Sequence, residues 1–121
     1  MLGAPKVTFT LPYPPSLNRI YRSKVNGGVR KTASAKKWAV DAGWAYKASG
    51  GIRLTGPVTI MVNLFQPADG QKRDVDNALK ILLDAMNGVA WIDDSQVVAI
   101  GAVKFPPRDR LGSAEVKIWQ L

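Results

Sequence analysis

The sequence contains the segment Asp74-Val75-Asp76-Asn77-Ala78-Leu79-Lys80-Ile81-Leu82-Leu83-Asp84-Ala85-Met86-Asn87, which predicts an amphipathic helix. Its apolar stripe is formed by four side chains at helical spacing: Leu79, Leu82, Leu83 and Met86. Gly88 follows directly and suits the end of the helix, because glycine readily adopts the positive φ of a C-terminal cap.

Strand patterns lie on both sides of this helix. Apolar residues alternate from Val58 to Leu64, and a second strand is predicted for about Gln96–Phe105. Further strands are predicted at Lys6–Leu11 and Ser113–Trp119, a helix at about Ser34–Ser49, and a long polar loop from Ser16 to about Thr32. The order β-α-β-α-β-β predicts an α+β two-layer sandwich, a four-stranded mixed sheet with helices on one face.

The composition excludes several classes of protein. With 121 residues and 46% hydrophobic residues, the chain is expected to form one globular domain, residues 1–121. It has no histidine and no cysteine, which excludes histidine triads, thiolate metal sites and disulfides. No apolar run approaches the roughly 18 residues of a membrane span, and no signal-peptide core begins the chain. We therefore expect no membrane partner, no small-molecule cofactor and a cytoplasmic location.

The charge favours nucleic acid as the partner. Lys and Arg number 17 against 9 Asp and Glu, giving a net charge of +8. Residues 1–40 contain eight cations and no acid, which a solvated basic face could explain. Against that explanation, the cations alternate with Tyr13, Asn18, Tyr21 and Asn26 in a loop with Gly and Pro, a pattern that resembles a phosphate-binding surface. The expected DNA-binding residues are Arg19, Tyr21, Arg22, Lys24, Arg30, Lys31, Lys72 and Arg73.

The acidic residues are concentrated in one segment of the chain. Six of the nine lie between residues 69 and 94. Asp74 and Asp76 begin the helix, and we expect Asp93-Asp94, from the following loop, to return to the same end of the sheet. Carboxylates gathered in a basic protein suit Mg²⁺ held against phosphate, with Mn²⁺ as an alternative. Lys80, one turn beyond Asp76, could offset charge on the reacting phosphate.

Each of these acids also has an ordinary structural explanation. Aspartate is favoured at helix N-termini, where it caps the helix and meets its dipole. Asp76, Lys80 and Asp84 are spaced as an i,i+4 ladder of ion pairs on an exposed helix. Asp93-Asp94 is compatible with turn chemistry. Against this, acids packed together raise one another's pKa unless a cation lies between them.

Three segments resemble the RusA family of Holliday junction resolvases: Leu11-Pro12-Tyr13-Pro14-Pro15-Ser16-Leu17-Asn18-Arg19-Ile20-Tyr21, Arg73-Asp74-Val75-Asp76-Asn77-Ala78-Leu79-Lys80 and Trp91-Ile92-Asp93-Asp94-Ser95-Gln96-Val97-Val98. The resemblance implies that Asp74, Asp76 and Asp94 bind Mg²⁺ and that Lys80 is needed for cleavage. It also implies a homodimer that cuts four-way junction DNA symmetrically and is encoded by bacteria, phages or prophages. Only Lys72 and Arg73 precede the first aspartate, where relatives can have a longer basic run.

Two further residues are expected to support the proposed metal ligands. Asn77 is expected to hydrogen-bond one of the paired aspartates, and Asp93 to support the site from beside Asp94. The tryptophan-bearing first helix is a candidate for the dimer contact. Two other functions remain open from the sequence: a related metal nuclease acting on flaps or forks, and a non-catalytic basic module whose acids only cap a helix.

Overall fold

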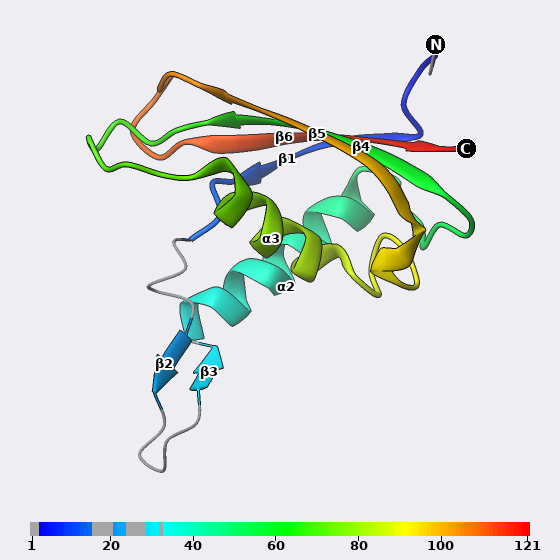
Figure 1. The fold of residues 1–121 in the computed structure, drawn as a ribbon, viewed down its shortest axis with the longest axis horizontal. Helices are drawn as coiled ribbons and strands as arrows, with labels where there is room; N and C mark the ends of the chain where they lie inside the picture. The colour runs from blue at the N-terminus through cyan, green and yellow to red at the C-terminus, as the bar shows by residue number, and fades with distance from the viewer. Residues whose placement is uncertain (1–2, 16–20, 24–28, 32) are drawn as a thin grey trace.

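The computed structural model describes residues 3–15, 21–23, 29–31 and 33–121, with only the backbone path for residues 21–23 and 29–31. Figure 1 shows the elements in chain order. They are β1 (Val7–Pro12), β2 (Tyr21–Ser23), β3 (Val29–Lys31), α2 (Ala33–Ala48), β4 (Val58–Phe65), α3 (Val75–Met86), the 3₁₀ turn η1 (Asp94–Gln96), β5 (Val97–Phe105) and β6 (Ser113–Gln120).

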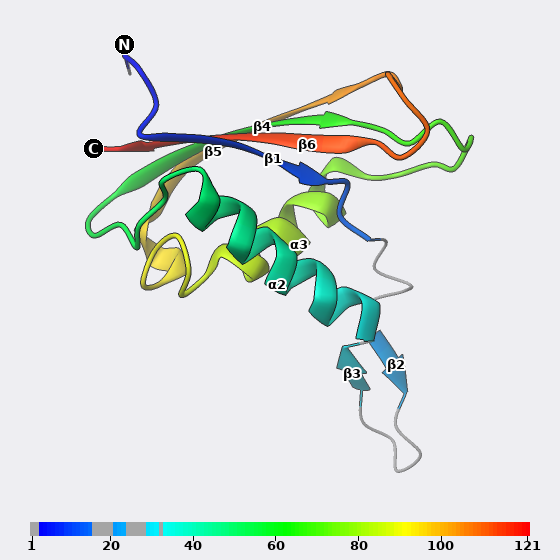
Figure 2. The ribbon, with the colours of Figure 1, turned by 180° about the vertical axis from the view of Figure 1, so that it is seen from behind.

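The main sheet has the strand order β1-β6-β4-β5. β4 and β5 are parallel, whereas β6 pairs antiparallel with both β1 and β4. Both helices cover the same face of this sheet, α2 near β1 and α3 near β5 (Figures 1 and 2). The predicted α+β sandwich, with a four-stranded mixed sheet and helices on one face, is therefore confirmed.

The core lies between the sheet and the helices. Alternate residues of β4 face it and are completely buried or nearly so: Val58, Ile60, Val62 and Leu64. From α3, Ala78, Leu82 and Met86 are buried against them, while Leu79 and Leu83 are only half-buried. The buried stripe of α3 therefore runs closer to Ala78 than the sequence pattern predicted. Gly88 has φ 80°, which confirms the predicted cap.

One part of the predicted loop from Ser16 to Thr32 is regular structure. β2 and β3 pair antiparallel, with Tyr21 opposite Lys31, and form a hairpin outside the main sheet. Each strand has three residues, too few for alternation to be recognised in the sequence. In the part of the chain that the structure describes, no helix is long and apolar enough to cross a membrane.

Candidate active site

Asp74 and Asp76 lie at the start of α3, with both side chains exposed. Asp74 occupies the N-cap position in an extended conformation (φ −94°, ψ 139°), but its carboxylate accepts no capping hydrogen bond from the helix backbone. Its neighbour Asn77 donates from Nδ2 to Asp74 Oδ2 at 3.5 Å, as the sequence predicted. Asp74 therefore holds the N-cap position without a capping hydrogen bond, and its exposed carboxylate has one weak partner.

Lys80 lies on the exposed side of α3, one turn beyond Asp76. The ion pairs found among the described residues are Lys37–Asp41, Arg73–Asp69 and Arg108–Glu115. The ladder that the spacing of Asp76, Lys80 and Asp84 allowed is absent from that set. Among the described residues, Lys80 therefore forms no ion pair with Asp76 or Asp84.

Asp94 is fixed by a tryptophan in the core. Trp91 is fully buried, and its Nε1 donates to Asp94 Oδ1 at 2.8 Å. The backbone of Trp91 forms bridges with Leu54 and Asn87, which tie this turn to the end of α3. Trp91 therefore anchors the loop that carries Asp94.

Asp93 and Gln96 shape the turn that presents Asp94. They form a capping box, in which Asp93 accepts from the Ser95 backbone N–H at 2.9 Å and Gln96 Oε1 accepts from the Asp93 N–H at 3.0 Å. Hydrogen bonds from the side chain and backbone of Ser95 lower the pKa of Asp93 below its ordinary value. Gln96 Nε2 also donates to the Leu54 and Gly56 carbonyls. The sequence reasoning missed Gln96, although the D-x-x-Q spacing was the signal.

The two groups of acids lie at opposite ends of α3 (Figure 1). The helix has 12 residues and is therefore about 18 Å long. The Lys104 Nζ, near the end of β5, donates to the Arg73 carbonyl at 3.0 Å, whereas Asp94 lies just before the first residue of β5. Among the described residues, no three acidic side chains gather closely enough to hold a metal ion.

The expectation that Asp74, Asp76 and Asp94 meet at one end of the sheet is therefore wrong within one chain. The reason is the crossover connection between β4 and β5, which contains α3. Because β4 and β5 are parallel, the connecting helix must run back along the sheet. The loop before α3 and the loop after it are consequently at opposite ends of the strands.

Arg73 fastens the loop before α3. Its guanidinium forms two hydrogen bonds with Asp69, at 2.7 and 2.6 Å, and lies 5.6 Å from the centre of the Tyr13 ring. These hydrogen bonds hold the pKa of Asp69 well below its usual range. Lys72 beside it is exposed. Of the two cations that precede the first aspartate, Lys72 is thus the one open to a phosphate.

The other predicted DNA-binding residues are on the N-terminal segment. Arg19 and Lys24 lie outside the described residues. The remaining four belong to the β2–β3 hairpin, whose backbone alone is described: Tyr21, Arg22, Arg30 and Lys31.

The structure adds cations that the sequence reasoning missed. The loop between β5 and β6 lies against the loop before α3, because the Ala68 N–H donates to the Arg110 carbonyl at 3.3 Å. Arg108 lies 3.4 Å from the centre of the Phe65 ring and pairs with Glu115. Arg108, Arg110 and Lys104 thus share the end of the sheet where Asp74 lies. The sequence did not indicate that these cations lie near Asp74, because their position follows from the parallel pairing of β4 and β5.

Similar proteins of known family all carry the same name. The family model described as "Endodeoxyribonuclease RusA" matches residues 12–118. The crossover junction endodeoxyribonuclease RusA of Escherichia coli (strain K12) is 37% identical over 101 residues, covering 82% of each chain. The enzyme of the same name from Enterobacteria phage 82 is 37% identical over 99 residues, covering 80% of this chain and 81% of the relative. A relative from Escherichia coli O139:H28 is 34% identical over 116 residues and covers 94% of both chains.

The family model begins at the last residue of β1 and ends within β6, so it contains both helices, β4, β5 and the segments around Asp74 and Asp94. The chain belongs to the RusA family of endodeoxyribonucleases.

Proposed function

We propose that this protein is a divalent-metal-dependent endonuclease that resolves four-way DNA junctions by paired symmetric cuts, in recombination and repair in a bacterial cytoplasm. Membership of the family supports the nuclease activity. One local observation supports the proposed metal dependence. Asp74 and Asp76 are exposed at a helix start, outside the ion pairs of the described residues, in a chain with net charge +8. Phosphate would be repelled there unless a cation intervened.

The residues divide into ligands and supporting groups. Asp74, Asp76 and Asp94 would supply carboxylate oxygens, which Mg²⁺ and Mn²⁺ both accept. A bound ion would polarise a phosphoryl oxygen and activate a water molecule. Lys80 would offset negative charge on the reacting phosphate, Asn77 would orient Asp74, and Asp93 would hold the turn of Asp94.

One chain does not bring these ligands together, because α3, about 18 Å long, lies between the two groups of acids. A two-fold dimer in which the two copies of α3 run antiparallel would place the Asp94 turn of one subunit beside Asp74 and Asp76 of the other. Two such mixed sites per dimer agree with two symmetric cuts. We therefore propose a homodimer as the active form.

The direct test is cleavage of a synthetic four-way junction with Mg²⁺, with Mn²⁺ and with EDTA, beside flap, fork and plain duplex substrates of matched length. Paired cuts in the junction that need the metal are the expected result. A protein that retards the junction in a gel but never cuts it would overturn the proposal. Faster cutting of flaps or forks would instead identify a related nuclease with another substrate.

Mixing two inactive variants tests how the site is shared. Asp74→Asn and Asp94→Asn proteins are each expected to be inactive. After subunit exchange, a mixed dimer has one site with both substitutions and one site with neither, provided that each site takes Asp94 from the partner. Nicking should then return, without efficient paired cutting. If each site were built within one chain, the mixture would stay inactive.

A further inference from the structure

The β5–β6 loop, residues 106–112, is fastened to the end of β4. The Gly112 N–H donates to Asp109 Oδ1 at 2.7 Å, which closes a tight turn at the tip of the loop. Gly112 has φ 74°, and a Cβ added there would lie 2.7 Å from both the Phe65 carbonyl oxygen and the Pro67 nitrogen. Glycine suits this position because it tolerates both the positive φ and the close approach of backbone. The tip of the loop is therefore seated on the sandwich.

Two further contacts fix the orientation of the loop. Arg108 lies 3.4 Å from the centre of the Phe65 ring and pairs with Glu115 at 3.1 Å. The Arg110 carbonyl accepts a hydrogen bond from the Ala68 N–H at 3.3 Å, which joins the loop to the segment before α3. Figures 1 and 2 show the two segments at the same end of the sheet. The β5–β6 loop is thus held near the acidic start of α3.

The tip of the loop presents one cation and one apolar side chain to solvent. Arg110 is exposed and forms no ion pair with any residue that the structure describes. Leu111 is 79% exposed, more than any other large hydrophobic residue in the described ranges. A single exposed leucine would need no explanation. Next to an unpaired arginine and near Asp74 and Asp76, it forms a surface with both a positive charge and an apolar group.

A branch point in DNA offers a partner for each of these groups. Backbone phosphates bind exposed guanidinium groups in every form of DNA. A base pair at the crossover of a four-way junction can lose the neighbour on which it would stack in a plain duplex. Proteins that hold distorted DNA place apolar side chains such as leucine against unstacked base pairs. The pairing of Arg110 with Leu111 therefore matches the chemistry of a crossover better than that of a plain duplex.

We propose that the β5–β6 loop contacts the crossover of a four-way junction, with Arg110 on a backbone phosphate and Leu111 against the exposed face of a base pair. The inference rests on the proposed function and adds to it a determinant of substrate choice. Arg110 strengthens binding to any DNA, because phosphates carry no information about branching. Leu111 strengthens binding only where a base-pair face is exposed, so it favours junctions over duplex.

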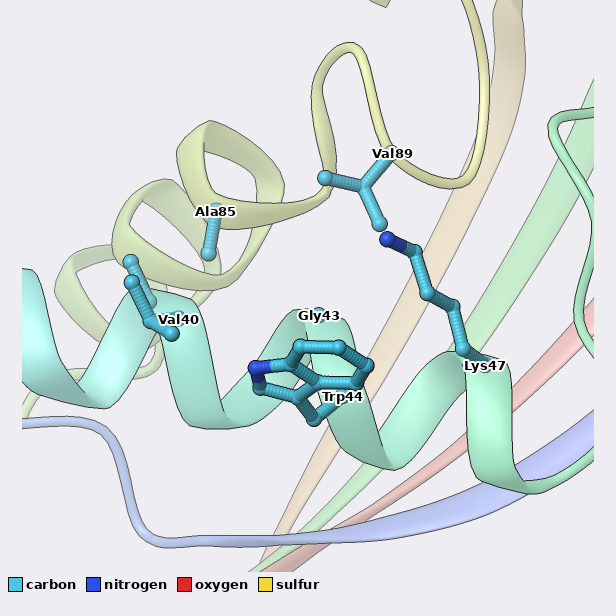
Figure 3. A pocket seen from close by; sticks show the side chains of 7 residues that line it. Val40, Gly43, Trp44, Lys47, Ala85 and Val89 are labelled. Carbon is cyan, nitrogen blue, oxygen red and sulfur yellow. The ribbon is translucent and has the colours of Figure 1, made fainter.

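The groove between α2 and α3 is the competing surface for a base (Figure 3). It has a volume of about 360 Å³ and is lined by Ala39, Val40, Gly43, Trp44, Lys47, Ala85 and Val89. Trp44 is 66% exposed, with the Lys47 Nζ 5.2 Å from its ring. Ala85 and Val89 lie at and just beyond the end of α3, so the groove is close to the end of this helix that is opposite Asp74. A base stacked on Trp44 would be held away from the acidic start of α3.

Two single-charge substitutions test the role of Arg110. Arg110→Gln is expected to weaken binding to junction and duplex by the same factor and to reduce the slope of log affinity against log salt by up to about 0.9. Lys117→Gln is the matched control, because it removes one positive charge from an exposed position on β6. It should change the slope much less. Equal changes of slope in the two variants would overturn the role of Arg110.

Two leucine substitutions test the contact with the crossover. Leu111→Ala is expected to lower affinity for the junction at least about fivefold and to leave affinity for duplex unchanged. Leu121→Ala is the matched control, since Leu121 is 63% exposed and follows β6 at the opposite end of the sheet. Gel retardation in EDTA measures binding without cutting, and circular dichroism checks that each variant folds. Loss of junction selectivity in Trp44→Ala, with none in Leu111→Ala, would overturn the inference.

A probe attached to the loop locates it on the DNA. The chain has no cysteine, so Leu111→Cys can be labelled with an iron chelate at this position alone. With ascorbate and peroxide, the chelate is expected to break the strands within a few nucleotides of the crossover. Leu121→Cys carries the same probe at the other end of the sheet and should break the DNA weakly or farther from the crossover. Breaks at the crossover from Leu121→Cys and not from Leu111→Cys would contradict the inference.

The loop contact and the proposed function can fail separately. A protein that never cuts a junction, but loses junction selectivity in Leu111→Ala, would overturn the function and leave the loop contact standing. A protein that cuts junctions, while Leu111→Ala keeps the selectivity of the wild type, would overturn the loop contact alone.

Discussion

Trp91 belongs to both the core and the site. Its ring is completely buried, while its indole N–H donates to the Asp94 carboxylate. A buried donor without this acceptor would be left unsatisfied, which typically costs about 1–3 kcal/mol. The position of Asp94 is therefore coupled to the stability of the fold.

Replacing Trp91 by phenylalanine should separate these two roles. We expect Trp91→Phe to lower the cleavage rate roughly 10-fold or more, as removal of a group that orients a metal ligand usually does. Trp38→Phe is the matched control, because Trp38 is also buried and donates to the Pro12 carbonyl, away from the acids. Both variants should lose about 1–3 kcal/mol of unfolding free energy in urea titrations, and only Trp91→Phe should lose activity. Equal activities would show that the Asp94 position does not depend on the indole.

Replacing the carboxylates should affect DNA binding and DNA cleavage in different ways. Asp74→Asn, Asp76→Asn and Asp94→Asn are each expected to abolish cutting while junction binding stays the same or tightens, because a ligand and a negative charge are both removed. Asp93→Asn should be milder, since Asp93 works within the turn. Gel retardation and single-turnover cleavage on the same junction separate the two effects. Near wild-type cutting by any two of the first three variants would contradict the assignment.

The role of Lys80 can be tested with one substitution that removes its charge and one that changes the shape of the charged group. If the Lys80 ammonium offsets charge that develops during the reaction, as proposed, Lys80→Ala should lose most turnover with little change in affinity. Lys80→Arg should restore activity only in part, since a planar guanidinium does not replace a point charge. Asp84→Ala is a suitable control on the same exposed helix surface. Normal cutting by Lys80→Ala would make the lysine an ordinary surface residue.

The loop before α3 depends on the pair formed by Asp69 and Arg73. The pKa of Asp69 is lowered in the folded protein, so this stabilisation is fully present above the unfolded pKa, near 3.9, and is lost as pH falls through the lower folded value. The difference in unfolding free energy between wild type and Asp69→Asn should be constant above about pH 5 and shrink below about pH 4. Repeating the titration in an Arg73→Gln background should remove most of this pH dependence.

Periodicity explains which elements could be predicted. The alternation of Val58, Ile60 and Val62 and the helical spacing of Leu79, Leu82 and Met86 are long enough to identify a strand and a helix, and both were predicted correctly. The β2–β3 hairpin was missed because its strands are too short. The positions of Asp74 and Asp94 within the fold were wrong because sequence patterns do not state whether two strands are parallel. The direction is known only from the three-dimensional structure, in which Thr59–Phe65 pairs in parallel with Ala99–Phe105.

At the scale of the whole molecule, acids and cations are concentrated in different parts of the chain, the acids in residues 69–94 and the cations in residues 1–40. The eight cations of residues 1–40 have no acids among them, and four of the predicted DNA-binding residues are on the β2–β3 hairpin. Figure 1 shows this hairpin extending from the start of α2, away from the main sheet. Affinity for DNA should therefore come largely from phosphate binding outside the sandwich, whereas cutting is expected to depend on the acids at the two ends of α3.

Neutralising the N-terminal cations should weaken binding to every DNA form. We expect the combined replacement of Arg19, Arg22, Lys24, Arg30 and Lys31 by glutamine to flatten the dependence of log affinity on log salt, by up to about 0.9 for each phosphate that the variant no longer neutralises. The control replaces Lys6, Arg53 and Lys117, which are exposed elsewhere on the sandwich. Compared per charge removed, the control should change the slope much less. Equal slopes per charge would mean that DNA senses only the net charge of +8, and that the hairpin has no particular role in holding the junction.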